Sequence, residues 1–584
     1  MQIRFLATVV LWVSCLIMSS SASAAAFPYY SGSRPDDAIA ADPILSATTF
    51  ATNRELDDLL SAALVGPSRN ASTVLVSQIA SPVTFQVAEP TLQANILRQQ
   101  ERSAMPAMSV MEEEEEELAG ETEQAVASTG DSVTSSATDA SDGTAAIAAS
   151  SAVTTALAES ELASAVDTAK AQVTVLINNA FVLVCAILVI IMSVPGVALF
   201  YGGLVRAKNV LSILQQCLVT FSLCMLLWFI VGYSWAFSGA GTVDSFWDLL
   251  LGNSDRVLLA GVSVEALSGN LNELNFVIFQ GAFCAISACL IVGAVAERMR
   301  FGALMLALAL WVLGSYVPLA HMVWGQGLIE HYFAAYDFAG GTVVHINAAM
   351  AAIVAAKMLG PRIDLNKVAL APHSLPLTYL GCGLLWMGWF GFNAGSELSP
   401  DGVSALAFVN TVLAPAAAAL VWALLERVLN GKSSSLGSAS GVLAGLVAIT
   451  PACAFVGPLG AVALGAISGA VCLWGVRGFK RLTKIDDSLD VFGIHGLGAI
   501  VGALLTGVFC APELGGMGYK GFHEGWLSQF AGQLGSVVVA MIWSGVVSYV
   551  AFFIAGKLCH SLRVSRDDER AGLDLTFHGE RGYS

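Results

Sequence analysis

The segment DFAGGTVVHINAAMAAIVAA, residues 337–356, decides the fold of this chain, and DVFGIHGLGAIVGALLTGVF, residues 490–509, follows the same plan. Each segment begins with an aspartate and continues as an apolar run that holds one histidine, His345 or His495. An ionisable side chain inside such a run is costly, and it indicates a path for a substrate or a proton. For one histidine alone, a packing role would explain the pattern equally well. The matching positions of the two favour a functional role.

The whole chain has the composition of a membrane protein. Of its 584 residues, 56% are hydrophobic and only 12% are charged, and the mean hydropathy is +0.70, far from the values of a soluble globular domain. The net charge of −17 comes in large part from one polar stretch that holds the run Glu112 to Glu117, so it says little about a substrate.

The N-terminal part indicates export. Residues 1–24 have the features of a signal peptide: Arg4, a short apolar run and Ala22-Ser-Ala24 as a cleavage site. An uncleaved first membrane helix is the alternative interpretation. Residues 25–171 are polar and of low complexity, and we predict an exported, mostly disordered extension, with enough apolar periodicity in residues 57–102 for one or two helices.

From residue 172 to 562 long apolar runs alternate with short loops, and we predict about eleven transmembrane helices. Lys and Arg gather in every second loop, which places the N-terminus outside and the C-terminus in the cytoplasm. An odd number of spans permits two five-helix halves of opposite topology plus one extra C-terminal helix. We therefore predict an all-α membrane domain at 172–562, packed closely through its many glycines, and a cytoplasmic tail at 563–584.

The remaining histidines have simpler interpretations. His321 lies near a span end and is interpreted as structural. Five others fall in loops, at the end of the last span or in the tail, where a solvated imidazole is expected: His331, His373, His523, His560 and His578.

Two aspartates open the histidine segments. Asp337 precedes a Gly-Gly pair, and its carboxylate either caps the helix start or binds a cation; we favour the cap. For Asp490, and for its neighbours Asp486 and Asp487, a cap is again the preferred interpretation.

Five aromatic residues of the apolar runs and their ends have two possible interpretations, namely Phe283, Trp324, Trp389, Phe390 and Phe392. They are either ordinary core and interface residues or a cation-π site above a pore that aromatic rings close.

Several motifs together resemble the Amt/Mep/Rh family of ammonium transporters, and the bacterial Amt type most of all. They are residues 337–347 and 490–496, with Gly388-Trp-Phe-Gly-Phe-Asn-Ala-Gly-Ser396, Pro195-Gly-Val-Ala-Leu-Phe-Tyr-Gly-Gly203, Ala296-Glu-Arg298 and Ala320-His-Met-Val-Trp324. The resemblance runs from about Asn178 to the C-terminus with the motifs in order. The long N-terminal extension departs from the family pattern.

The resemblance implies a role for each matching residue. Trp324 and Ser396 would form an external ammonium site supported by Asp337, Phe283 and Phe392 would form a stacked gate beneath it, and His345 with His495 would form the twin-histidine pair. It also implies a homotrimer in the cell inner membrane with one pore per subunit. The segment from Glu569 to Glu580 resembles the family's tail and implies regulation by a PII-type (GlnK-like) protein.

Chemistry supports the same function. Ammonium resembles potassium in size and charge, so a transporter gains selectivity by removing a proton that potassium lacks and by passing neutral ammonia through an apolar pore. We predict ammonium transport, with net electrogenic transport as the expected mode. The alternatives are a passive ammonia or carbon dioxide channel and an ammonium receptor. The sequence shows no nucleophile-base arrangement, metal-ligand spacing or phosphate loop, and we predict no enzyme activity, cofactor, metal or nucleic-acid partner.

Overall fold

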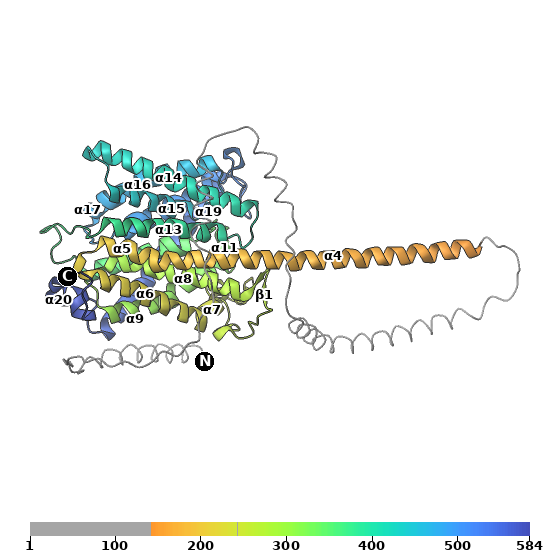
Figure 1. Ribbon diagram of the computed structural model, residues 1–584, viewed down its shortest axis with the longest axis horizontal. Coiled ribbons are helices and arrows are strands. Elements are labelled where there is room, and N and C mark those ends of the chain that lie inside the picture. The colour runs from red at the N-terminus through yellow and green to blue at the C-terminus, as the bar shows by residue number, and fades with distance from the viewer. Residues whose placement is uncertain (1–141, 242, 584) are drawn as a thin grey trace, which may run out of the picture. The chain divides into compact units, whose positions relative to one another are not determined.

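The computed structural model describes residues 142–241 and 243–583. Residues 158–583 belong to one compact unit, in which long helices lie side by side with similar axes (Figure 1). The predicted signal peptide and residues 25–141 of the predicted extension lie outside the described residues.

Ten helical segments of the described chain are long and apolar enough to cross a membrane. They are Leu162–Leu204, Ala207–Phe237, Glu273–Val295, Phe301–Trp324, Gly341–Leu359, Leu375–Gly395, Gly402–Asn430, Pro458–Thr483, Phe492–Phe509 and Trp526–Leu558. The apolar helix Ser435–Ile449 is shorter. The predicted helical membrane fold is confirmed, whereas the described residues contain ten candidate spans against the predicted number of about eleven.

The first five spans and their loops contain the following elements in chain order: α4 (Asp142–Ile191), η1 (Met192–Val197), α5 (Ala198–Leu204), η2 (Ala207–Asn209), α6 (Val210–Leu227), η3 (Trp228–Gly232), α7 (Tyr233–Phe237), η4 (Phe246–Leu249), η5 (Val257–Leu259), β1 (Leu267–Ser268), β2 (Leu271–Asn272), α8 (Glu273–Val295), α9 (Phe301–Trp311), η6 (Val312–Tyr316), α10 (Val317–Trp324), α11 (Leu328–Phe333), η7 (Gly341–Ile346) and α12 (Asn347–Leu359). The two strands form an antiparallel hairpin in which Leu267 pairs with Asn272.

The rest of the chain adds α13 (Leu375–Gly395), α14 (Gly402–Asn430), α15 (Ser435–Ile449), α16 (Pro458–Trp474), η8 (Gly475–Phe479), α17 (Lys480–Thr483), η9 (Phe492–Gly496), α18 (Leu497–Phe509), η10 (Pro512–Leu514), α19 (Trp526–Leu558), α20 (Arg566–Ala571) and α21 (Leu573–His578). In Figure 1, α17, α20 and the C-terminus lie at one end of the bundle, and α7 and β1 lie at the other.

Helix α4 differs from the prediction for residues 142–171. We predicted disorder through residue 171, but α4 begins at Asp142 and runs without a break to Ile191. The prediction is therefore wrong for residues 142–171. Its polar composition was misleading because the segment is rich in alanine and has no glycine or proline between Thr144 and Ser193, and such a sequence favours helix.

The centre of the bundle is formed by α8 and by the span that contains α9 and α10. In their most apolar windows 83% and 89% of the residues are buried, against 33% in α14 and α19. Glycines allow close contact between helices, as predicted: a Cβ added to Gly381 of α13 would lie 2.2 Å from the backbone nitrogen of Phe200 in α5.

Buried charges tie together the loops at the end of the bundle that carries the C-terminus. The Glu297 carboxylate pairs with Arg206 at 3.0 Å and with Arg362 at 3.2 Å. Arg362 also pairs with Asp486 at 3.0 Å, and Arg298 donates to the backbone oxygen of Asp486 at 2.5 Å. Because each carboxylate has a guanidinium partner, this network can stay buried and hold the loop that leads to His495.

The C-terminal tail is folded against the same end of the chain. The Asp574 carboxylate accepts hydrogen bonds from the backbone N–H groups of Leu211 and Ser212 at 3.1 and 2.8 Å. Glu569 accepts one from Ile363 at 2.8 Å. Asp574 and Glu569 are both buried, so the tail is not a loose solvated segment.

Candidate functional site

A large cavity opens at the end of the bundle that carries α7 and β1. This cavity, here called the vestibule, has a volume of about 660 Å³ and is lined by Phe283, Trp324 and Ser396 among other residues. The indole Nε1 of Trp324 donates to the backbone oxygen of Asp337 at 2.9 Å, which fixes the ring. The Ser396 hydroxyl donates to the Phe392 oxygen at 2.9 Å, so its own lone pairs remain available as acceptors.

Sequence reasoning missed an ionic group in the vestibule wall. Glu273 is buried, accepts a hydrogen bond from the Tyr233 hydroxyl at 2.9 Å and pairs with Arg256 at 3.1 Å. Its position at the start of an apolar span was the available signal. The paired arginine offsets its charge, so this group shapes the cavity more than it attracts cations.

Two phenylalanines close the floor of the vestibule. The rings of Phe283 and Phe392 are stacked with centroids 4.0 Å apart and planes 13° from parallel, and both side chains are buried. Phe283 also lines the vestibule, whereas Phe392 lines a second cavity beneath it. The stacked pair therefore separates the two cavities.

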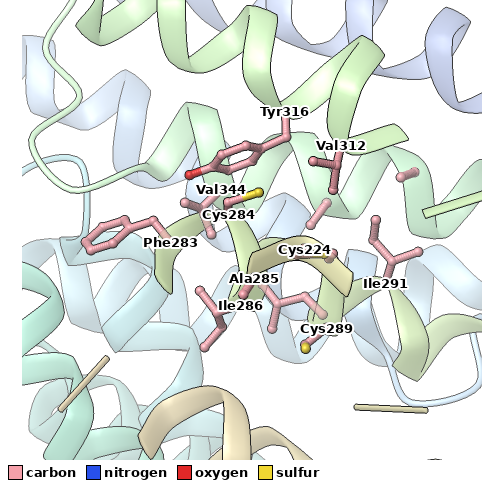
Figure 2. Close-up of a cluster of buried hydrophobic side chains, with 14 of the residues drawn as sticks. Cys224, Phe283, Cys284, Ala285, Ile286, Cys289, Ile291, Val312, Tyr316 and Val344 are labelled. Atoms are coloured by element: carbon pink, nitrogen blue, oxygen red, sulfur yellow. The ribbon is translucent and has the colours of Figure 1, made fainter. Parts of the chain in front are cut away.

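Figure 2 shows the buried side chains around Phe283, one of the two rings. The buried side chains of Cys284, Ala285 and Ile286 follow Phe283 along α8, and Tyr316 and Val344 lie beside them. Close packing of this kind resists displacement of the Phe283 ring.

The second cavity, here called the histidine cavity, contains both predicted histidines. His345 and His495 line it together with apolar and aromatic side chains, and their Nδ1 atoms lie 3.2 Å apart. The cavity has a volume of about 10 Å³, which is about the minimum for one water molecule. A hydrated ion does not fit this space.

The hydrogen bond between the rings constrains their protons. When both imidazoles are neutral, one Nδ1 carries a proton and the other accepts it. One Nε2 is then an acceptor and the other a donor. The Nε2 atom of His345 is buried without a partner, so the pair offers an unused polar contact to a small molecule.

His345 is further held by Trp389, one of the aromatic residues singled out in the sequence. The two rings stack at 5.4 Å, and the Trp389 Nε1 donates to the Thr450 hydroxyl at 2.9 Å. Phe390, by contrast, stacks on Phe408 and does not line either cavity.

Both histidines lie in short π-helical turns that open a span, His345 in η7 and His495 in η9. Asp337 caps η7: its carboxylate accepts from the backbone N–H groups of four residues at 2.6–3.2 Å. The preferred interpretation of Asp337 as a cap is confirmed. Gly340 has φ +107°, a backbone conformation that a residue with a side chain adopts only with strain. The turn at Gly340 aligns the N–H groups with the carboxylate.

In the second half, the cap is Asp487 and not Asp490. Asp487 lies eight residues before His495, as Asp337 lies eight before His345, and it accepts from the Phe492 N–H at 2.7 Å. Asp490 pairs with Lys480 at 2.7 Å instead, and Asp486 pairs with Arg362. Capping is therefore wrong for Asp490 and Asp486, because both carboxylates have cationic partners within reach.

Two other histidines differ in outcome. His321 contacts the backbone oxygens of Ala236 and Asp248 at 2.9 and 2.8 Å, which supports its structural interpretation. His523 was expected to be solvated, but it is buried between the Ser528 hydroxyl and the Phe333 oxygen, both at 2.8 Å. The start of α19 covers this loop residue, which its position in the sequence does not reveal.

Comparison with known proteins identifies the family. The model of the Ammonium Transporter Family matches residues 180–583. The ammonium transporter of Bacillus subtilis (strain 168) is 41% identical over 408 residues, which cover 70% of this chain and 98% of that protein. The ammonium transporter of Aquifex aeolicus (strain VF5) is 41% identical over 407 residues, with 70% and 93% covered.

Solved structures agree with this result. A protein described as a sensor Amt protein has a TM-score of 0.64 at 29% identity, covering 70% of this chain and 99% of its own. Mep2 of Candida albicans has a TM-score of 0.61 at 33% identity, covering 67% and 87%. The chain belongs to the ammonium transporter family.

Proposed function

We propose that this protein transports ammonium across the cell inner membrane and that ammonia, rather than the cation, crosses its centre. The observation that carries the proposal is the order of the site: a wide vestibule, a stacked phenylalanine pair and a narrow cavity with two histidines. Names of the relatives point to the same substrate.

Recruitment takes place in the vestibule. The Trp324 ring offers a cation-π surface and the Ser396 hydroxyl offers an acceptor lone pair. Asp337 holds the backbone of η7 and fixes the Trp324 indole through its own carbonyl oxygen. The cation then loses a proton before it passes Phe283 and Phe392.

Passage takes place through the histidine cavity. Its apolar lining makes a charge costly and a small neutral molecule acceptable. The shared hydrogen bond between His345 and His495 leaves polar Nε2 positions that ammonia can contact in turn. Transfer of the released proton along a separate route makes net transport electrogenic.

The proposed topology follows from the sequence. We count α15 as a span, which brings the number of spans to eleven. The helices up to α12 then form one half and those from α13 to α18 form the second, inverted half. Helix α19 is the extra helix. The equal spacing of Asp337 and Asp487 from their histidines supports this repeat. The N-terminus lies outside, residues 1–24 are a signal peptide, residues 25–141 an exported extension, and the tail lies in the cytoplasm.

The assembly is proposed by analogy with the family. The protein forms a homotrimer with one pore per subunit, and its tail is the docking point for a PII-type (GlnK-like) protein. Truncation at Arg566 that changes neither transport nor binding of such a protein would contradict the regulatory role.

A second candidate is an ammonium receptor, and one observation favours it: the similarity to a protein described as a sensor Amt protein. A passive gas channel is a third. Proteoliposomes that contain the purified protein distinguish these functions. A current evoked by ammonium but not by an equal gradient of sodium supports electrogenic transport. Ammonia flux without current indicates a gas channel, and binding without flux indicates a receptor.

A further inference from the structure

The two capping aspartates differ in how their carboxylates are satisfied. Both oxygens of Asp337 accept backbone hydrogen bonds, four in all. Asp487 is just as buried, with 2% of its surface exposed, but its carboxylate accepts through Oδ2, from the Phe492 N–H at 2.7 Å. Its Oδ1 is buried without a partner.

A cap does not explain the free oxygen. An unpartnered carboxylate oxygen in a buried site destabilises the ionised form, because nothing replaces the water it has lost. The polar and charged groups near it have other partners. Lys480 is paired with Asp490 at 2.7 Å, Arg298 donates to the backbone oxygens of Gly360 and Asp486, and the Tyr201 hydroxyl donates to the backbone oxygen of Leu290. None of these groups forms an ion pair or a hydrogen bond with the Asp487 carboxylate among the described residues.

We propose that Asp487 is the group that receives and releases the transported proton at the end of the pore nearest the C-terminal tail. This inference rests on the proposed electrogenic transport. In each cycle ammonium gives ammonia and one proton in the vestibule. The proton is later bound at the Asp487 Oδ1 to form a neutral carboxyl group, and it then passes to cytoplasmic water and restores the carboxylate. One ammonia and one proton cross, so charge and atoms balance.

The pKa of Asp487 suits a group that accepts and releases a proton. Burial raises the pKa of Asp487 to about 6, an increase to which Asp490 contributes and which Lys480 opposes. A group with a pKa near the working pH is efficient both in accepting and in releasing a proton. Asp337, with all its acceptor positions used, lacks a free oxygen for the same purpose.

The test is the ammonium-evoked current of Asp487→Asn in proteoliposomes. Asparagine can still accept from the Phe492 N–H, but it cannot bind and release a proton. We expect the current per folded protein to fall about tenfold or more, and Asp487→Glu to restore part of it. Asp567→Asn, which changes an exposed carboxylate of the C-terminal tail, is the control and is expected to keep its current.

A purely structural cap would behave differently. Asp487→Asn would then lower the thermal unfolding midpoint and leave the current per folded protein unchanged, and this result would overturn the proposal.

If this variant does not fold, the pH dependence of the wild-type current tests the proposal. With pH changed equally on both sides, its current should rise between about pH 5 and about pH 7.5 as Asp487 loses its resident proton. A current that is independent of pH over that range would overturn the role of Asp487, whereas a wild type without any ammonium current would contradict the proposed transport itself.

Discussion

The Nδ1 atoms of His345 and His495 lie 3.2 Å apart, and their rings are 21° from parallel with centroids at 5.2 Å. None of the described residues that line their cavity carries a carboxylate. Two imidazolium ions at this distance would repel each other without compensation, so the geometry suits two neutral rings. The cavity is therefore suited to a neutral permeant and hostile to a cation.

Replacement of either histidine by aspartate should change this preference. A carboxylate in the cavity stabilises a permeating cation where a neutral imidazole does not. We expect His345→Asp and His495→Asp either to conduct potassium as well as ammonium or to lose ammonium transport while remaining folded. The measurement is the ammonium and potassium current, normalised to protein in the membrane.

His321→Gln is the control for this experiment, because His321 is buried among backbone oxygens and lines neither cavity. It should lower stability without altering ion preference. If both pore variants kept the wild-type rate and selectivity, the twin-histidine mechanism would be refuted.

Asp337→Ala should destabilise the folded protein and abolish transport together. The change leaves four buried N–H groups at the start of η7 without their acceptor, and we expect a loss of about 2 kcal/mol or more. Asp401→Ala is a matched control, since Asp401 caps α14 in an exposed position. It should cost less and leave ammonium uptake intact. Unfolding in detergent and uptake assays measure both effects.

Much of this fold and site could be predicted because its signals are local. The apolar runs predict spans, and the histidines stand out as rare ionisable groups within them. The stacked arrangement of Phe283 and Phe392 came from family resemblance, since an aromatic residue in a span gives no local sign of its partner.

The misassigned cap shows what local signals leave out. Asp486, Asp487 and Asp490 are indistinguishable by composition, and their roles depend on which cations the fold brings near. Asp486 forms an ion pair with Arg362, which lies more than a hundred residues away in sequence, and Asp490 forms one with Lys480. The hydrogen bond from the Phe492 N–H identifies Asp487 as the cap, and its equal spacing to the histidine was the one sign of this in the sequence.

The predicted extension should be unnecessary for transport. Deletion of residues 25–141, with residues 1–24 and all of α4 retained, should leave ammonium uptake near the wild-type level, because the matched family region begins at residue 180. Uptake by cells that depend on ammonium, with the amount of protein in the membrane as the control, measures this. A loss of uptake despite normal insertion would show that the extension contributes to function.

Asp574→Ala should release the C-terminal tail. The change removes the acceptor for the N–H groups of Leu211 and Ser212, so amide hydrogen exchange in residues 566–583 should accelerate while the spans stay protected. Asp567→Ala changes an exposed carboxylate of the same tail and should leave exchange unaltered. Equal exchange in the two variants would show that Asp574 does not anchor the tail.

The buried charge network predicts a loss of stability in acid. Burial alone would raise the pKa of Glu297, but Arg206 and Arg362 hold that pKa below its ordinary value. Asp486 has a lowered pKa for a similar reason, with Arg362 as the main cationic partner opposing burial. A carboxyl group with a lowered folded pKa stabilises the fold above its ordinary unfolded pKa, and this contribution is lost as pH falls through the folded value.

Arg362→Gln should therefore lower the free energy of unfolding by about 3–5 kcal/mol at neutral pH and weaken the decline of stability below about pH 4.5. Arg477→Gln, which loses a longer and more exposed pair with Glu426, should cost less and keep the acid decline. Thermal unfolding of the three proteins in detergent across this pH range decides the matter: an acid decline in Arg362→Gln as steep as in the wild type would mean that other carboxylates cause it.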